Sequence, residues 1–124
     1  MKIDEYIEHD GLGLAALVAK GEVTAAELAA CATALVAARN PALNAVLSVL
    51  EHQRFAPAGP FVGVPFLVKE LVLQVEGAPS RAGSRATPTL RAGADSSLMG
   101  RFRAAGLHLV GTTQTPEMGY NATT

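Results

Sequence analysis

Hydrophobic positions in the first third of the chain follow the spacing of helices. Ile3 and Ile7 lie one helical turn apart, and a weak apolar stripe continues to Lys20. Gly21 is placed to end this first helical region. The G-x-G-x-x-A pattern of residues 11–16 formally fits a dinucleotide-binding loop, but no strand precedes it, and we read it as part of a helix.

A second helix is predicted by the pair Thr24 and Glu27, which has the T-x-x-E spacing of a capping box. The apolar positions that follow extend this helix over residues 25–39. Pro41 disfavours helical geometry at Asn40, so the helix is expected to end there.

Three apolar runs predict strands. The run 46–50 is apolar and contains β-branched residues, which favours a strand, but it is so short that a helix remains an alternative. After a loop over residues 52–65, the run 66–68 is bounded by Gly and Pro and suits a buried strand, with apolar residues continuing to Val75. Residues 107–110 form the third run.

The rest of the chain predicts loops and one further helix. Residues 76–94 lack periodicity and are expected to form a long irregular loop. Asp95 or Ser96 then caps a helix that Gly106 closes, and residues 111–124 are again loop-like. This order favours an α/β layer fold, but so few strands do not bury both faces of a sheet, so we expect the fold to be incomplete.

Composition excludes several classes of protein. The 124 residues are 49% hydrophobic and 17% charged, with a net charge of -1 and a pI near 6.3, which gives no basic footprint for nucleic acid. The sequence shows no run long enough to span a membrane and no visible signal peptide. A single cysteine excludes an internal disulfide and agrees with a cytoplasmic location.

Few side chains outside the strand ends are candidates for a catalytic or metal-binding role. His9, His52 and His108 do not have the spacing of metal ligands, so no metal site is predicted. Cys31 lies among Ala and Leu and is expected to pack in the core. The hydroxyl of Ser84 has no paired histidine. The three arginines of the long loop are expected to be solvated charges; they are Arg81, Arg85 and Arg91.

Lys69 is the residue with the clearest chemical potential, because it ends the apolar run 66–68. A lysine whose stem starts in apolar surroundings can lose its proton near neutral pH, since desolvation disfavours the charged form. It can then act as a general base. The alternative is an ordinary lysine at a strand end that extends its ammonium group into water.

Three segments in order resemble conserved blocks of the amidase signature family. GPFVGVPFLVKE (59–70) is similar to G-P-L-x-G-x-P-x-x-V-K-D. ADSSLMGRFRAAGLHLVGTTQTPEMG (94–119) is similar to A-x-D-S-x-x-V-x-R-L-R-x-A-G-A-x-x-x-G-K-T-N-T-P-E-F-G. GEVTAAELAACATALVAARNPALNAV (21–46) resembles the family's opening helix. The TPEMG ending is similar to the subgroup of 6-aminohexanoate cyclic dimer hydrolase-like amidases.

The resemblance implies an N-terminal part of the family's α/β/α fold, with a mixed sheet that is incomplete in this chain. Residues 1–124 would form one partial amidase domain, with helices over 1–40 and the first strands, the lysine segment and the TPEMG loop over 41–124. No cofactor is implied.

The same resemblance implies a Ser–cis-Ser–Lys triad in which Lys69 is the catalytic base. Both serines would lie beyond Thr124, and a Gly/Ser-rich loop there would stabilise the oxyanion. Met118 and Gly119 are the positions that would contact substrate. Three positions depart from the family pattern: Glu70 replaces Asp, and Thr112 and Gln114 replace Lys and Asn.

The predicted function is that of an N-terminal part of an enzyme that hydrolyses a C–N amide bond in a small-molecule substrate. By itself the chain is expected to be inactive, and poorly folded or oligomeric, because its apolar strands would lack partners. The expected partners are a homo-oligomer or a complementing C-terminal half. The alternative is a non-catalytic interaction or assembly module that binds through an exposed apolar sheet face.

Overall fold

The computed structural model describes residues 1–51 and 53–124, and His52, the first residue of the predicted loop 52–65, lies outside them. The elements in chain order are α1 (Ile3–Tyr6), α2 (Gly11–Ala19), α3 (Ala25–Leu43), β1 (Val46–Val49), β2 (Pro65–Lys69), α4 (Ser97–Ala104), β3 (His108–Thr113) and the 3-10 turn η1 (Glu117–Gly119). The strands form a mixed sheet in the order β1-β3-β2, in which β3 is antiparallel to β1 and parallel to β2.

α3 and α4 begin where the sequence predicts, at the caps Thr24 and Ser96. The single helical region predicted up to Lys20 is instead divided into α1 and α2, because the chain turns before Asp10 and a new helix starts there. The backbone N–H of Glu27 donates to Thr24 Oγ1 at 3.2 Å, and the backbone N–H of Thr24 donates to Glu27 Oε2 at 2.8 Å, which confirms the capping box of α3. Residues 11–16 are helical in α2, and Asp10 caps this helix by accepting from the N–H of Gly13. The dinucleotide-binding reading of this segment is therefore excluded by its structure.

The predicted end of α3 at Asn40 is wrong, because the helix continues through Pro41 to Leu43. It ends at Asn44, a left-handed residue with φ of 49° whose N–H donates to Asn40 O at 2.7 Å. The Asn40 side chain also donates to Val46 O and accepts from Val46 N, both at 2.8 Å. These bonds stabilise the last turn and the chain that leads into β1, which offsets the donor that proline lacks.

The strand boundaries differ from the predicted ones on both sides of the sheet. The alternatives for residues 46–50 are decided in favour of a strand, β1. β2 ends at Lys69 and does not continue to Val75, because tight turns follow it and Val72 is left-handed with φ of 70°. β3 extends beyond residue 110 to Thr113, since as the central strand it finds partners on both sides.

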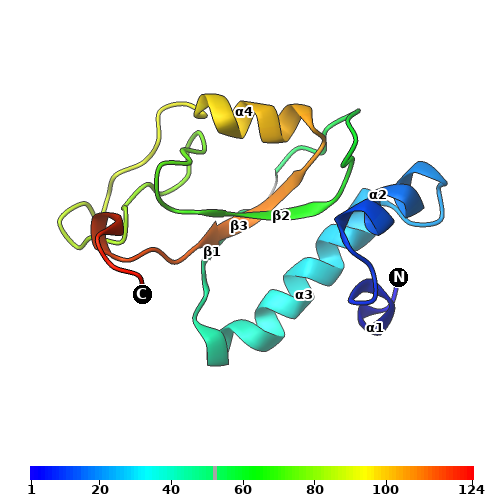
Figure 1. Ribbon diagram of the computed structural model, residues 1–124, viewed down its shortest axis with the longest axis horizontal. Helices are drawn as coiled ribbons and strands as arrows, with labels where there is room; N and C mark the ends of the chain where they lie inside the picture. The colour runs from blue at the N-terminus through cyan, green and yellow to red at the C-terminus, as the bar shows by residue number, and fades with distance from the viewer. Residues whose placement is uncertain (52) are drawn as a thin grey trace.

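Helices cover both faces of the sheet, with α4 on one side and α3 on the other (Figure 1). Met99 of α4 is fully buried against Val68 and Leu109, which are each 1% exposed. On the same face the rings of Phe66 and Phe102 lie 4.8 Å apart between centroids. This arrangement confirms the α/β layer fold, because alternate residues of each strand are available to pack on each helix.

A second core lies between α2, α3 and the loop before β2. It includes the buried side chains of Leu14, Val23, Leu28 and Val64. Cys31 is also buried, as predicted, and its thiol lies 3.6 Å from the carbonyl oxygen of Met1. Among residues 1–51 and 53–124, no helix is both long enough and apolar enough to cross a membrane.

Candidate active site

Lys69 lies at the carboxyl end of β2, beside the carboxyl end of the parallel strand β3. It is in register with Thr113, and the N–H of Glu70 donates to Thr113 O at 3.1 Å. The chain after both strands therefore emerges at one edge of the sheet, on the left of Figure 1, together with loop 76–94 and η1. Ligand sites of open α/β sheets form outside the carboxyl ends of the strands.

Lys69 is exposed whereas its neighbour Val68 is buried, so the described residues do not supply the apolar surroundings expected for its stem and leave it, in this chain, as a lysine that extends into water. Successive side chains of a strand point to opposite faces, and only that of Val68 packs in the core beneath α4. In addition, β2 is an edge strand of the described sheet, so one of its sides has no neighbouring strand. The apolar enclosure expected around the lysine is therefore not formed by the described residues.

Glu70 is the buried charge of this edge, at 4% exposure. Its Oε1 accepts from the backbone N–H of Arg81 at 2.8 Å and from Arg81 Nε at 3.1 Å. Its Oε2 accepts from Arg81 Nη2 at 3.4 Å. The interpretation of Arg81 as a solvated charge is therefore wrong: this arginine neutralises a buried carboxylate and joins loop 76–94 to the end of β2.

Two of the positions that depart from the family pattern meet at this point. Thr112 is 2% exposed, and its hydroxyl lies 3.4 Å from Glu70 Oε2. The sequence treats them as separate differences, 42 residues apart, but the fold makes them neighbours. The sequence could have indicated this contact, because a carboxylate that directly follows a buried strand needs hydrogen-bond donors.

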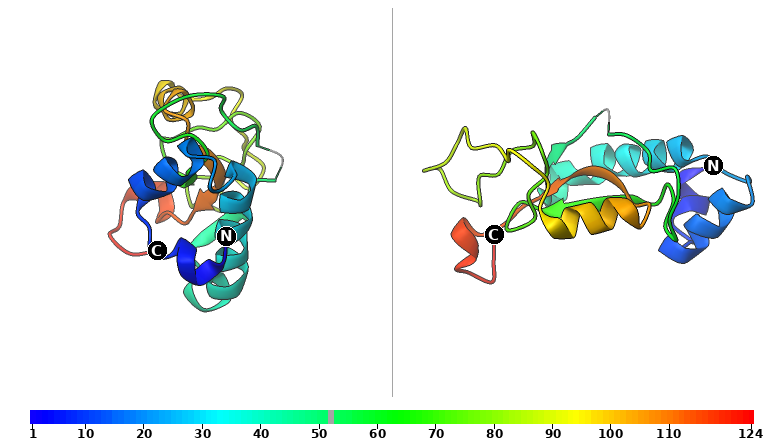
Figure 2. Two further views of the ribbon diagram at one scale, coloured as in Figure 1. Left: turned by 90° about the vertical axis from the view of Figure 1, so that its right-hand side faces the viewer. Right: turned by 90° about the horizontal axis from the view of Figure 1, so that it is seen from above.

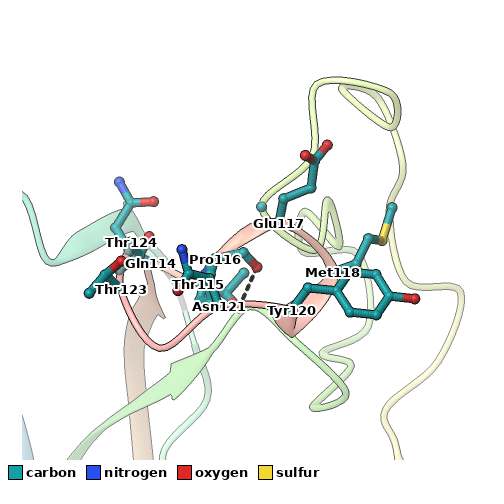
Figure 3. Close-up of a pocket in the computed structure, with 10 residues that line it drawn as sticks. Gln114, Thr115, Pro116, Glu117, Met118, Tyr120, Asn121, Thr123 and Thr124 are labelled. Carbon is teal, nitrogen blue, oxygen red and sulfur yellow. Dashed lines mark hydrogen bonds between the residues drawn. The ribbon is translucent and has the colours of Figure 1, made fainter.

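The TPEMG segment turns back over loop 76–94. Met118 has φ of 51° in η1, and its N–H donates to Ala82 O at 2.8 Å. Ser84 is buried, and its hydroxyl donates to Glu117 Oε1 at 2.7 Å. Figure 3 shows the Glu117 side chain extending from the turn towards that loop. Ser84, which offered a free hydroxyl in the sequence, thus binds the turn to the loop.

An open groove of about 600 Å³ lies on the turn side of this contact. Its lining residues come from the loop and the end of the chain: Gly83, Gln114, Thr115, Pro116, Glu117, Met118, Tyr120, Asn121, Thr123 and Thr124. Met118 is therefore placed at a groove. Within the described part of the chain, Gly119 and Lys69 do not line it; Gly119 packs instead on Leu71, two residues after Lys69.

The comparison with protein families identifies this sheet edge as part of a known fold. The Amidase family profile matches residues 14–124, which is most of the chain. The chain belongs to the amidase family. This confirms the resemblance that the three sequence blocks indicated.

Relatives of this amidase chain include a cyclic-dimer hydrolase and a lipoamidase. The chain is 37% identical over 129 residues to a 6-aminohexanoate-cyclic-dimer hydrolase of Paenarthrobacter ureafaciens, covering 99% of this chain and 26% of that protein. It is 32% identical to a lipoamidase of Enterococcus faecalis, covering 94% and 17%. A structure of 6-aminohexanoate cyclic dimer hydrolase with substrate matches with a TM-score of 0.85 and 36% identity, covering 94% and 25%. The chain thus spans about a quarter of the length of the cyclic-dimer hydrolases and about a sixth of the lipoamidase.

Further ionisable groups of the amidase chain have shifted pKa values because of contacts within the fold. Arg103 Nε donates to Asp95 Oδ2 at 2.6 Å, and this hydrogen bond lowers the pKa of Asp95. Burial lowers the pKa of His108, whose ring stacks on Phe55 with centroids 4.0 Å apart at the amino end of β3. Among the described residues, no three His, Cys, Asp or Glu side chains are grouped to hold a metal ion.

Proposed function

We propose that Lys69 is the general base of an amidase that hydrolyses a C–N amide bond by a Ser–cis-Ser–Lys mechanism, with both serines lying beyond Thr124. The observation that carries this proposal is the position of Lys69 at the shared carboxyl edge of β2 and β3, beside the TPEMG block. Membership of the amidase family supports it. The enclosure that Lys69 lacks within this chain would come from the part of the catalytic unit that carries the serines.

The proposed reaction has two halves. Neutral Lys69 takes a proton through the bridging serine from the nucleophilic serine, whose oxygen bonds to the amide carbonyl carbon. Backbone N–H groups stabilise the resulting oxyanion. The C–N bond then breaks as the proton passes to the leaving amine. Water, deprotonated along the same route, hydrolyses the acyl-enzyme to a carboxylic acid and restores the serine.

We further propose that Met118 and Gly119 contact the substrate, a small-molecule amide. Met118 lines the groove of about 600 Å³ and offers an exposed, adaptable apolar side chain. The names of similar relatives make 6-aminohexanoate cyclic dimer the first substrate to test.

The test is a chimera in which this chain replaces the matching quarter of the Paenarthrobacter hydrolase. Release of amine from 6-aminohexanoate cyclic dimer is measured for the parent chimera, for Lys69→Ala and for the matched control Lys20→Ala. Lys69→Ala is expected to lower kcat by roughly 10²–10⁴-fold, the usual contribution of a general base, while the control retains activity. Full activity of Lys69→Ala would refute the assignment.

A second candidate, an assembly module, is favoured by a separate observation. An apolar groove of about 310 Å³ lies between α3 and β2, and its lining includes Leu35, Val36 and Leu67. Size-exclusion chromatography and thermal unfolding of the 124-residue chain distinguish the candidates. A monodisperse, cooperatively folded and inactive species favours the module, whereas aggregation that a complementing C-terminal segment relieves, with amide hydrolysis restored, favours the amidase part.

A further inference from the structure

We propose that Glu70 is a positioning residue that couples Lys69 to the Met118 turn through a short segment, residues 81–84, which we term the RAGS clip. The catalytic meaning of this coupling rests on the proposed function of Lys69. The coupling itself is a property of the fold and can be measured without turnover. Two links make it, one at each end of the clip.

The first link joins the residue after Lys69 to the start of the clip. The Glu70 side chain is 2% exposed and the Arg81 side chain 31%, so the carboxylate is the buried member of the pair. One carboxylate oxygen accepts from both the backbone and the side chain of Arg81. A buried carboxylate without such donors is strongly destabilising, so Glu70 fixes the backbone of the clip and not only an arginine head group.

The second link joins the clip to the TPEMG block. Ala82 and Gly83 are left-handed, with φ of 50° and 67°, and this reversal presents Ala82 O to the N–H of Met118 at 2.8 Å. A Cβ atom at Gly83 would lie 2.3 Å from Thr115 O, which shows how closely the two backbones approach. Ser84 closes the link through its hydrogen bond to Glu117.

The two links form a continuous path of hydrogen bonds and backbone contact from β2 to the turn. The right-hand view of Figure 2 shows loop 76–94 and the end of the chain beyond the same end of the sheet. Lys69 and Glu70 are consecutive, so locking the Glu70 side chain into the core fixes the backbone from which Lys69 extends. The clip then holds Met118 in a constant position relative to that backbone.

The composition of the chain provides sensitive probes for this path. There are three methionines, of which Met118 lies in the turn and Met99 is fully buried between α4 and the sheet. Methyl-¹³C methionine spectra of the labelled 124-residue chain, joined by its unlabelled complementing C-terminal segment where the chain alone aggregates, therefore report the turn and the core separately. Lys69 is one of three lysines, so labelled lysine reports its surroundings with little overlap.

The decisive variant is Glu70→Gln, which keeps the shape of the side chain and removes its charge. We expect the Met118 methyl and Lys69 Cε signals to shift and the Met118 amide to exchange at least tenfold faster, with the Met99 signal unchanged. Glu76→Gln, an exposed carboxamide change in the same loop, is the matched control and should change none of them. Glu70→Asp keeps the charge and should restore part of the Met118 protection.

Unchanged Met118 and Lys69 signals in Glu70→Gln would overturn the proposal. If Glu70→Gln also shifts the Met99 signal, the second variant is Arg81→Gln, which removes the same ion pair by changing its partly exposed member. A response of Met118 without Met99 in that variant supports coupling, whereas a response of both methionines in both variants overturns it, since the pair would then hold the whole fold. Activity that survives Lys69→Ala would refute the proposed function and leave these spectra, and the coupling, intact.

Discussion

Substituting Gly83 tests the closest backbone approach of the candidate site. The residue has φ of 67°, a conformation that costs an alanine roughly 1–2 kcal/mol. Its new Cβ atom would also lie 2.3 Å from Thr115 O, so the clip must move away by about an ångström to reach an ordinary contact distance. That movement breaks the bond from Met118 N to Ala82 O, worth about 0.5–1.5 kcal/mol. Gly83→Ala should therefore destabilise the contact between residues 81–84 and the Met118 turn by about 2–3 kcal/mol of folding free energy.

Gly77 provides a matched control within the same loop. It has φ of 74°, but among the residues that the structure describes no atom lies within 4 Å of the position that its Cβ would take. Gly77→Ala therefore carries the backbone strain and the reduced entropy of the unfolded chain, without the collision. Urea unfolding and amide exchange at Met118 should show a larger effect for Gly83→Ala, with faster exchange in that variant alone. Equal effects of the two substitutions would refute the close contact and, with it, the second link of the RAGS clip.

Three further predictions concern the fold around the site. Met99→Ala should lower the free energy of unfolding by about 2–5 kcal/mol in urea titrations, because the side chain is fully buried. The pKa of Asp95 is lowered, so its ion pair with Arg103 contributes its full stability above the ordinary aspartate pKa of about 3.9. This contribution is lost as the pH falls through the folded pKa of Asp95, and Asp95→Asn should remove that acid dependence from thermal melts. The lowered pKa of His108 means that stability should decline as pH falls below about 6.5, and His108→Gln should flatten this part of the profile.

Local signals in the sequence predicted the elements of the fold well, whereas their ends depended on tertiary partners. The Thr24 capping box is specified within four residues, and α3 begins there. The end of α3 depended on Asn40, which reaches Val46 after the helix has ended and so stabilises a turn that Pro41 alone argues against. The length of β3 likewise depended on strands far away in the sequence.

The candidate site was predictable as far as its residues, but not in its contacts. The family pattern singled out Lys69, yet its exposure follows from the face of β2 to which it points and from the place of β2 at the edge of the described sheet. Both depend on how the strands and helices pack, which the residues next to Lys69 do not specify. A carboxylate after a buried strand needs a cationic partner, and the chain offers seven arginines. Arg81 is the partner because the path of loop 76–94 brings both its backbone N–H and its guanidinium to Glu70. The Thr87 hydroxyl fixes this position by donating to Arg81 O at 2.7 Å. Thr87→Val should therefore weaken the Glu70 pair without changing either charged residue, so the geometry of the loop, more than its charge, specifies the partner.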